Sequence, residues 1–448
     1  MATVPPSSEL LTDLYELNML RAYLAQDMTG TAVFDLYVRT LPPQRNYLVA
    51  AGLEDVLLYL ESLAFSPASL DALAAVGLPA DFLDSLATFR FTGDVDAVAE
   101  GTPIFAGEPI LRVEAPLPQA QFIETYLLNQ VHLQTTLASR AARVVRAAAG
   151  RSVVDFGARR AHGIDAANKA ARSGYLVGFT GTSNVLAAHR YRIPPAGTMA
   201  HSYVQAIGDE LTAFRTFAAT SPETVLLVDT YDTIQGIHNV IALANELGDN
   251  FRVRGVRIDS GDLVSLANQA RALLDDAGLT EVSVIASGGL DEHDIARLVA
   301  SGAPIDAFGV GTHIVTSADA PTLDAVYKLA SYEGDARIKL SHDKATLPAR
   351  KQVWRIYDGD FAHHDLIGLA DETIDGLPLL MPAMRAGRRV SPSPPLDNLR
   401  TTSASLRQRL PASLHALTPA DTPYPVHLTA ALDAARAEAA QRASAFSN

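Results

Sequence analysis

The sequence contains no cysteine among its 448 residues. Disulfide bonds, thiolate metal sites and thiol nucleophiles are therefore excluded together, so any nucleophile or metal ligand must be His, Asp, Glu, Ser, Thr or Lys. The chain also has no run of about 18 apolar residues, the length that a membrane span needs. Its first residues, MATVPPSSEL, lack the basic and apolar regions of a secretory signal. We therefore expect a cytoplasmic protein with no membrane partner.

Basic residues are in the minority, with 36 Lys and Arg against 50 Asp and Glu and a net charge of −14. Such a field repels a phosphate backbone, so nucleic acid is not expected as a partner. A small anion can still bind where arginines and backbone N–H groups are concentrated in one cleft. The sequence G-x-x-x-x-G-K-[ST] is absent, so nucleotide chemistry would have to proceed without that phosphate loop.

The chain divides into segments of different texture. Residues 1–118 combine a helical pattern in ELLTDLYELNMLRAYLAQD with alternation in TAVFDLYVRTLP and with short β-rich pieces, which predicts an α+β domain. Residues 119–149 contain neither glycine nor proline and end before Gly150, as a long linking helix would. Residues 331–448 hold two strand-like pieces, ARIKLSHDK and KQVWRIYDGD, a proline-rich stretch predicted as a loop, MPAMRAGRRVSPSPP, and a closing helix.

Residues 150–330 show a regular alternation of short apolar runs and helical patterns. The runs are SVVDFG, YLVGFT, TMAHSY, TVLLVDT, RGVRIDSG, VSVIASGG and DAFGVGT. This βα repetition predicts a parallel sheet, and the number of units favours a closed or nearly closed barrel. A polar residue or glycine ends each predicted strand: Asp155, Thr180, His201, Asp229, Asp259, Ser287 and Gly311. Catalytic groups of barrels sit on the rim formed by these ends.

Two glycine clusters follow the last two predicted strands, Ser287-Gly288-Gly289 and 309–312. Both offer backbone N–H groups near the start of a helix, the arrangement that holds a phosphate. Each cluster is equally consistent with a tight turn that has no ligand. Their place on neighbouring strands is that of the usual phosphate site of a barrel.

Arginines occur at two other predicted strand ends. Arg159 and Arg160 follow a strand and precede a helix, where they suit either a polyanion such as pyrophosphate or salt bridges at the surface. Alternation puts Arg257 and Asp259 on the same side of their strand. A buried Arg257 needs an anionic partner, which is either Asp259 or the carboxylate of a ligand.

Histidine at position 201 has two interpretations: a core histidine with satisfied ring nitrogens, or an imidazole placed at a strand end for chemistry. We assign Asp229, on the next predicted strand, to orienting this rim histidine. His363 and His364 lie in an Asp-rich turn and are interpreted as ordinary surface residues. The remaining basic group is interpreted as a solvated turn, with anion binding as the alternative; it comprises Arg385, Arg388 and Arg389.

Taken together, eight stretches resemble nicotinate phosphoribosyltransferases, in the order and setting of that family. They are LLTDLYELNML, FDLYVRTLPPQRNYLVAAGLED, DFGARRAHGIDAANKAARSGYLVGFTGTSN, GTMAHSYVQA, LLVDTYDT, GVRIDSGDL, ASGGLDEHDI and FGVGTHIVTS. The resemblance implies the type II phosphoribosyltransferase fold, an irregular α/β barrel beside an α+β domain formed from both chain ends. It also implies that nicotinate and PRPP (phosphoribosyl pyrophosphate) are joined to nicotinate mononucleotide and pyrophosphate, with coupled ATP hydrolysis, Mg²⁺ and a place in NAD salvage by the Preiss-Handler route.

Roles for individual residues follow from the same resemblance. His201 is implied to be phosphorylated by ATP, with Asp229 supporting its ring and Asp259 contacting the ribose. The residues implied to bind nicotinate are Phe156, Thr198, Arg257 and, from the neighbouring subunit of a homodimer, Tyr15. The residues implied to hold PRPP and its phosphates are Arg159, Gly288, Gly289, Gly311 and Thr312.

Two other functions compete with this interpretation. A nicotinamide-specific phosphoribosyltransferase would differ in one or two polar groups of the pocket, although the motifs favour nicotinate. A silent barrel that binds a phosphorylated metabolite as a sensor would be indicated by loss of His201, Asp229 or Arg257, and all three are present. The sequence departs from the family pattern at Ser202, where some members have Glu, and at His162, where Gln is common.

Overall fold

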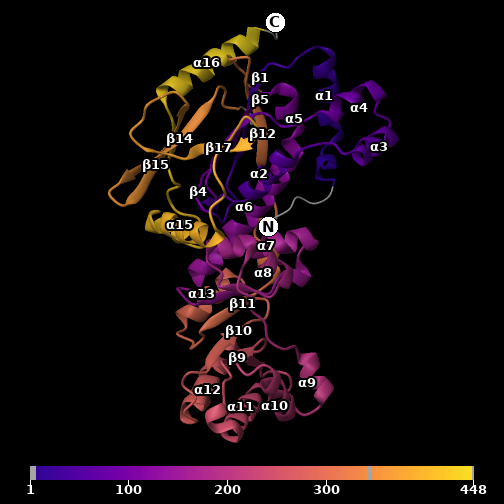
Figure 1. Cartoon of the computed structure of the whole chain (residues 1–448). Helices are drawn as coiled ribbons and strands as arrows, with labels where there is room; N and C mark the ends of the chain where they lie inside the picture. Colours follow the sequence, from indigo (N-terminus) through magenta and orange to yellow (C-terminus); the bar gives the residue numbers. More distant parts are fainter. Residues whose placement is uncertain (1–6, 341–345, 446–448) are drawn as a thin grey trace. The chain divides into compact units, whose positions relative to one another are not determined.

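The computed structural model describes residues 7–340 and 346–445 (Figure 1). The chain forms two compact units: residues 1–139 together with 322–448, and residues 140–321. The first unit thus joins both chain ends, and the predicted mixed α/β fold is confirmed. The division falls within α6 (Glu124–Ala147) and at residue 321, whereas the sequence analysis placed it at the ends of a linking helix and at residue 330.

A seven-stranded antiparallel sheet is the centre of the first unit. Its strands run in the order β13 (Asp335–Ala336), β12 (Ala325–Tyr332), β1 (Thr31–Val38), β5 (Pro109–Pro116), β3 (Asp94–Val98), β17 (Leu380–Arg385) and β18 (Arg388–Arg389). Strands from the two chain ends therefore lie side by side, as β1 does with β12 and β3 does with β17. This long-range pairing makes one unit of two distant parts of the sequence.

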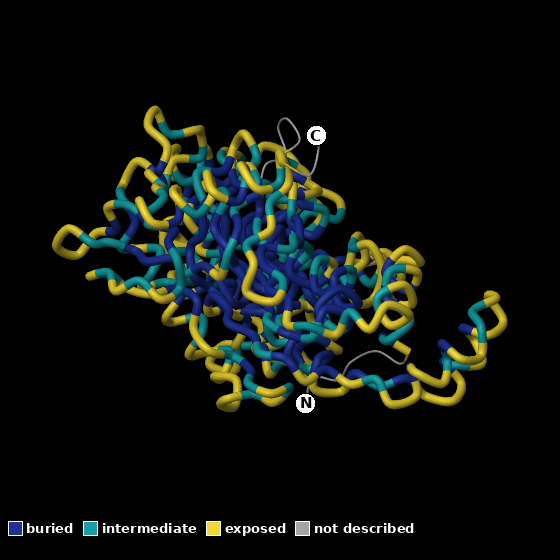
Figure 2. The backbone as a smooth tube through the Cα atoms, turned by 90° about the horizontal axis from the view of Figure 1, so that it is seen from above, coloured by how far each residue is buried: buried dark blue, intermediate teal, exposed yellow. Residues whose placement is uncertain are grey.

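Helices of the N-terminal part pack on the core of this sheet. They are η1 (Ser8–Leu10), α1 (Leu14–Ala25), α2 (Leu53–Ser62), α3 (Pro67–Ala75), α4 (Ala80–Ala87) and α5 (Leu117–Phe122). The predicted helix over 119–149 is instead two helices, α5 and α6, which break at Ile123. The apolar side chains of helices and strands share one buried cluster, in which Leu20 and Val113 are fully enclosed. Figure 2 shows the backbone coloured by burial, with the buried segments surrounded by exposed turns.

The C-terminal part adds a four-stranded sheet to the first unit. The strands of this sheet run in the order β16 (Leu377–Pro378), β14 (Lys351–Asp358), β15 (Phe361–Leu369) and β19 (Val426–Leu428). A separate pair of short strands is formed by β2 (Leu48–Val49) and β4 (Pro103–Ile104). The remaining helices of this unit are α15 (Leu396–Gln408), η4 (Ala412–His415) and α16 (Ala430–Ala445). His363 and His364 lie on β15, where their Nδ1 atoms are 2.8 Å apart.

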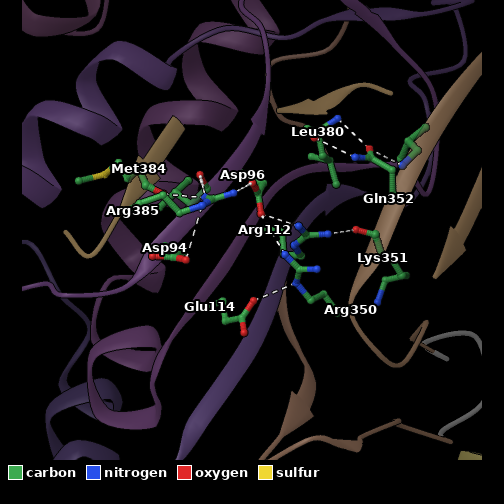
Figure 3. A network of polar contacts seen from close by, with 12 residues as sticks. Asp94, Asp96, Arg112, Glu114, Arg350, Lys351, Gln352, Leu380, Met384 and Arg385 are labelled. Carbon is green, nitrogen blue, oxygen red and sulfur yellow. Dashed lines mark hydrogen bonds and ion pairs between the residues drawn. The ribbon is translucent and has the colours of Figure 1, made fainter. Parts of the chain in front are cut away.

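A polar network links strands of the two chain ends inside the first unit (Figure 3). Asp96 on β3 accepts hydrogen bonds from Arg112 on β5 and from Arg385 on β17, the latter at 2.6 Å. Lys351, which is fully buried, lies 2.7 Å from the carboxylate of Asp35 on β1. Because each charge has a partner of opposite sign, the cost of burying these groups is offset.

Only the second half of the proline-rich stretch after residue 380 is the predicted loop. Most of its first half forms β17 and β18, and the register of β17 shifts next to Pro382. Proline has no N–H to donate to a ladder, so an irregularity of this kind is where a strand tolerates it. Arg389 is not solvated as predicted: its side chain is 13% exposed and is paired with Glu54 and Glu61.

The second unit is built on a parallel sheet that forms a half-barrel. Its strands run in the order β7 (Gly181–Thr182), β6 (Ser152–Asp155), β11 (Ala307–Val310), β10 (Ser283–Ala286), β9 (Gly255–Ile258) and β8 (Val225–Leu227). The helices between them are η2 (Ala158–Arg160), α7 (Ile164–Val177), α8 (Val185–Tyr191), α9 (His201–Ile207), α10 (Glu210–Thr220), α11 (Thr233–Leu247), η3 (Gly248–Asn250), α12 (Leu263–Asp276), α13 (Glu292–Ala300) and α14 (Thr312–Val315).

Asp and Asn side chains start several of these helices soon after a strand has ended. Asp232, Asp262 and Asp291 each accept a hydrogen bond from a backbone N–H in the first turn of α11, α12 and α13. Such caps satisfy N–H groups that the helix itself leaves unpaired. The strand-to-helix turns are thereby fixed at the edge of the sheet where the strands end.

Two predicted strands are wrong. YLVGFT covers the end of α7 and the residues before β7, and TMAHSY does not enter the sheet. Pro195 forms an isolated bridge with Thr182, and the segment then runs to His201, which is the first residue of α9. Among the described residues, no single helix is long and apolar enough to cross a membrane, although α2 and α3, which meet at 94°, pass that test when taken together.

Candidate active site

Parallel pairing brings the predicted rim residues to one edge of the half-barrel. Asp155 ends β6, and Asp229, Asp259, Ser287 and Gly311 follow β8, β9, β10 and β11. Each of these strands pairs with its neighbour in parallel register, so all of them end on the same side. These five positions therefore form one continuous rim, which is where α/β folds place binding groups. The other two predicted strand ends do not belong to it, because Thr180 precedes β7 and His201 begins α9.

Arg257, on β9, is the most enclosed cation of this rim. Its Nη1 lies 3.4 Å from Asp259 Oδ1 and 3.4 Å from Ser287 Oγ, and its Nη2 donates to the carbonyl of Met199 at 2.9 Å. The side chain is 13% exposed, and its Nε is buried without a hydrogen-bond partner. Burial lowers the pKa of Arg257, against the opposing effect of Asp259. Because its contact with Asp259 is long and its Nε–H has no hydrogen-bond partner, the guanidinium can bind a further anion.

An aromatic ring lies beside this guanidinium. The Arg257 guanidinium carbon is 5.8 Å from the centre of the Phe156 ring, within the range of a cation–π contact. A Cβ atom at Gly309 would stand 2.5 Å from that ring, so the absence of a side chain on β11 leaves space for Phe156. Gly309 was not singled out as a site residue, although it lies in the quoted motif FGVGTHIVTS.

The turn after β6 is held by a buried carboxylate. Asp155, which is 3% exposed, accepts hydrogen bonds from the N–H of Gly157 at 2.8 Å and from Thr182 Oγ1 at 2.7 Å. Burial raises the pKa of Asp155, although both hydrogen bonds oppose this effect. The turn it fixes carries Phe156 and then the exposed Arg159, whose charge acts on Arg257. Two guanidinium groups therefore face one rim.

The glycine turns lie next to these arginines. Gly288 and Gly289 have φ values of +103° and +72°, a region that favours glycine, and both are exposed before Asp291 caps α13. Gly311 precedes Thr312, the first residue of α14. The backbone of both turns is thus open to an anion, as a phosphate site requires.

His201 is half-buried, and its ring contact differs from the prediction. Its Nδ1 lies 3.1 Å from Thr230 Oγ1. Asp229 instead accepts hydrogen bonds from the N–H of Asp259 at 3.0 Å and from Ser260 Oγ at 2.6 Å. In this structure the Oδ2 of Asp229 holds the turn after β9, and the ring contact of His201 is with Thr230; the role of Asp229 towards the ring stays a prediction. Sequence reasoning missed Thr230, whose only signal was its place after Asp229 in LLVDTYDT.

Two further predicted residues lie on segments other than the strand ends of the half-barrel. Thr198 is half-buried in the segment before α9, where its hydroxyl donates to the carbonyl of Met199 at 3.1 Å. Tyr15 lies on α1 of the first unit and is 46% exposed. Burial and the neighbouring Glu124 raise the pKa of Tyr15, so it stays protonated at neutral pH.

A metal ion would have few ligands from the protein. No group of three or more His, Asp or Glu side chains in residues 7–340 and 346–445 is arranged to hold one. Asp229 Oδ1, however, is buried without a hydrogen-bond partner, and Asp259 lies beside it. Mg²⁺ is commonly held by one or two carboxylates together with substrate phosphates, so these residues fit that ion.

Comparison with known proteins identifies the family. Residues 10–132 match the model of the nicotinate phosphoribosyltransferase (NAPRTase) N-terminal domain, and residues 151–344 match that of the nicotinate phosphoribosyltransferase (NAPRTase) family. The chain is 52% identical to nicotinate phosphoribosyltransferase pncB2 of Mycobacterium tuberculosis, over 93% of this chain and 90% of the relative. It is 46% identical to nicotinate phosphoribosyltransferase of Bacillus subtilis, over 82% and 78%.

A solved structure agrees with these matches. The crystal structure of human nicotinic acid phosphoribosyltransferase superimposes with a TM-score of 0.86 at 28% identity, covering 96% of this chain and 100% of the human chain. The resemblance found in the sequence motifs is thereby confirmed: the chain belongs to the nicotinate phosphoribosyltransferase family.

Proposed function

We propose that this enzyme transfers the phosphoribosyl group of PRPP to nicotinate, giving nicotinate mononucleotide and pyrophosphate in NAD biosynthesis. The observation that carries the proposal is the buried Arg257, which has an aromatic ring on one side and two open glycine turns along the same rim. Nicotinate carries a carboxylate on an aromatic ring and PRPP carries phosphates, so the two substrates match these two parts of the rim. Membership of the family supports the same reaction.

Nicotinate binds, in this proposal, with its ring against Phe156 and its carboxylate near the free Nε of Arg257. A guanidinium recognises a carboxylate through two parallel hydrogen bonds, which an amide cannot match. Thr198 lies on the segment whose Met199 carbonyl already holds Arg257. Tyr15, exposed on α1, completes the ring site from the partner subunit of a homodimer.

PRPP occupies the remaining rim. Gly288, Gly289, Gly311 and Thr312 offer backbone N–H groups to its phosphates, and Arg159 adds charge. Asp259 faces the ribose. As the ring nitrogen of nicotinate bonds to the anomeric carbon, the bond from that carbon to pyrophosphate breaks and the leaving oxygens gain charge. Positioning and cation charge are what the protein supplies. Mg²⁺, held by Asp229 and Asp259, would neutralise charge on the leaving pyrophosphate.

His201 is the proposed acceptor of the γ-phosphoryl group of ATP, with ADP as the leaving group. Its Nδ1 contact with Thr230 leaves Nε2 as the nitrogen open to phosphorylation. A phosphohistidine adds close to two negative charges, which arginines and a metal ion on the same rim would stabilise electrostatically. Formation and hydrolysis of this group would couple ATP to PRPP binding and product release on the Preiss-Handler route in the cytoplasm.

The proposed reaction is tested by incubating the purified protein with PRPP, MgCl₂ and either nicotinate or nicotinamide, with and without ATP. Mononucleotide formation is followed by chromatography. We expect nicotinate mononucleotide as the product and faster formation when ATP is present. Equal rates from nicotinamide would reject the choice of substrate, and no nucleotide from either base would reject the reaction.

A further inference from the structure

A buried group of four charges lies next to the two glycine turns within the second unit. Arg140 and Arg143 lie on α6, Glu292 is the first residue of α13, and Asp319 follows α14. Arg140 Nη1 is 2.6 Å from Glu292 Oε1 and 3.0 Å from Asp319 Oδ1, and Arg143 Nε is 2.9 Å from Glu292 Oε1. The side chains of Arg140 and Glu292 are 3% and 0% exposed. Two cations thus face two anions.

Glu292 connects this group to the first glycine turn. It lies three residues after Gly289, and between them Asp291 caps α13 by accepting the N–H groups of His293 and Asp294. Asp294 in turn accepts the N–H of Asp291, so the start of the helix is closed on both sides. A shift of Glu292 would therefore move the glycine turn with it.

Asp319 connects the same group to the second glycine turn. It stands in the tight turn after α14, the short helix that begins directly after Gly311. Ser317 in that turn has a φ of +45°, is 1% exposed and donates to the carbonyl of Ala320 at 2.9 Å. The backbone around Asp319 is thus fixed locally. One guanidinium, that of Arg140, touches the elements behind both turns.

Stability alone does not account for such a group. Replacing a buried ion cluster by apolar residues is often neutral or even stabilising, because desolvation offsets the attraction between the charges. A planar guanidinium does, however, set the spacing of two carboxylates, which a lysine cannot do. We propose that Arg140 is a positioning residue that holds the two glycine turns at the spacing that the phosphates of PRPP require, with Arg143 supporting Glu292 on the side of the first turn. This inference rests on the proposed function, because it takes the turns to be the phosphate subsite.

The test is the Michaelis constant for each substrate in R140M and R140K. We expect R140M to raise KM for PRPP about tenfold while KM for nicotinate changes less than about twofold, because binding depends on sub-ångström placement of the donors. R140K should remain close to R140M, since an ammonium lacks the two-sided geometry. R215M is the matched control: Arg215 forms an exposed pair with Glu246 in the same unit and should leave both constants unchanged.

A second variant covers the case in which R140M does not fold. D319N keeps the shape of the side chain and removes only the charge on the α14 side, where Asp319 is 12% exposed. It should show the same selective rise in KM for PRPP. Wild-type constants in folded variants, or a parallel rise for both substrates, would overturn the positioning role. If the wild type makes no nucleotide, calorimetric titration with PRPP replaces kinetics, and unchanged affinity in D319N has the same meaning.

Discussion

A Cβ atom on Gly288 would stand 2.9 Å from the carbonyl carbon of Asp259 and would overlap its oxygen. The turn after β10 therefore packs against the end of β9 with no space for a side chain. Gly289, one residue later, also has a positive φ but has no atom within 4 Å of the corresponding point. A side chain at Gly289 would therefore meet only an unfavourable φ, whereas a side chain at Gly288 would also collide with the backbone of Asp259.

Substitution of each glycine by alanine follows from this difference. G289A should lower the free energy of unfolding by about 1 kcal/mol, the cost of an unfavourable φ for a residue with a Cβ. G288A should lower it by at least about 2 kcal/mol, because the strand end must also move. Denaturant unfolding monitored by circular dichroism measures both. Equal losses in the two variants would show that the packing against Asp259 is not tight.

Replacement of Arg257 by glutamine tests the nicotinate subsite. R257Q removes the charge while keeping hydrogen-bonding capacity, so kcat/KM for nicotinate should fall by about 100-fold or more. The rate with nicotinamide should change much less, since an uncharged amide makes no ion pair with the guanidinium. The ratio of the two kcat/KM values is therefore the measurement. A parallel fall for both bases would assign Arg257 to the fold of the rim instead of to the carboxylate.

The contact between His201 and Thr230 leads to a labelling experiment. With ATP that carries ³²P in the γ-phosphate, the wild type should become labelled and H201A should not. T230V removes the hydroxyl 3.1 Å from Nδ1 and should slow labelling by about tenfold, the value of one lost hydrogen bond to a reacting group. Serine at the same position is the control and should restore the rate. Label that persists in H201A would exclude His201 as the acceptor.

The half-barrel and its rim could be predicted because their signals are local. Apart from β7, each strand is a short apolar run, each is followed within a few residues by a helical pattern, and parallel pairing then brings the strand ends together. Asp259, Ser287 and Gly311 reach their places in this way. His201 does not, because a six-residue apolar run cannot be told from the start of a helix by periodicity alone. Its ring is placed by α9 and Thr230 instead.

The C-terminal strands show the other limit of local patterns. β17 pairs with β3, almost 300 residues earlier in the chain, and Arg389 finds Glu54 and Glu61 at a similar separation. The sequence around Pro382 does not indicate either of these distant partners, and its prolines favour a loop. Long-range partners decide the structure there, so the first half of the stretch forms strands and Arg389 is paired, whereas residues 391–395 form the predicted loop and Arg388 is exposed beside a turn, as predicted.

A buried acid in the first unit makes stability depend on pH. Glu108 is 1% exposed and accepts the N–H of Phe105 at 2.9 Å. Burial and the neighbouring Asp365 carboxylate raise its pKa well above the ordinary value of 4.5. Between that value and the higher pKa of the folded state, the folded chain holds one proton more than the unfolded chain. The stability linked to this proton is therefore present below pH 4.5 and is lost as pH rises through the folded pKa.

The variant E108Q separates this effect from other titrations, because glutamine keeps the acceptor oxygen and cannot ionise. Its melting temperature should exceed that of the wild type by at least about 2 °C at pH 8, and the difference should shrink as the pH is lowered towards 5. Differential scanning calorimetry over this range gives the comparison. E438Q, which replaces an exposed acid on α16, should follow the wild type throughout. If E108Q is instead less stable than the wild type at pH 8, Glu108 is ionised in the folded protein and its charge is paired with the guanidinium of Arg355, which already binds Asp365.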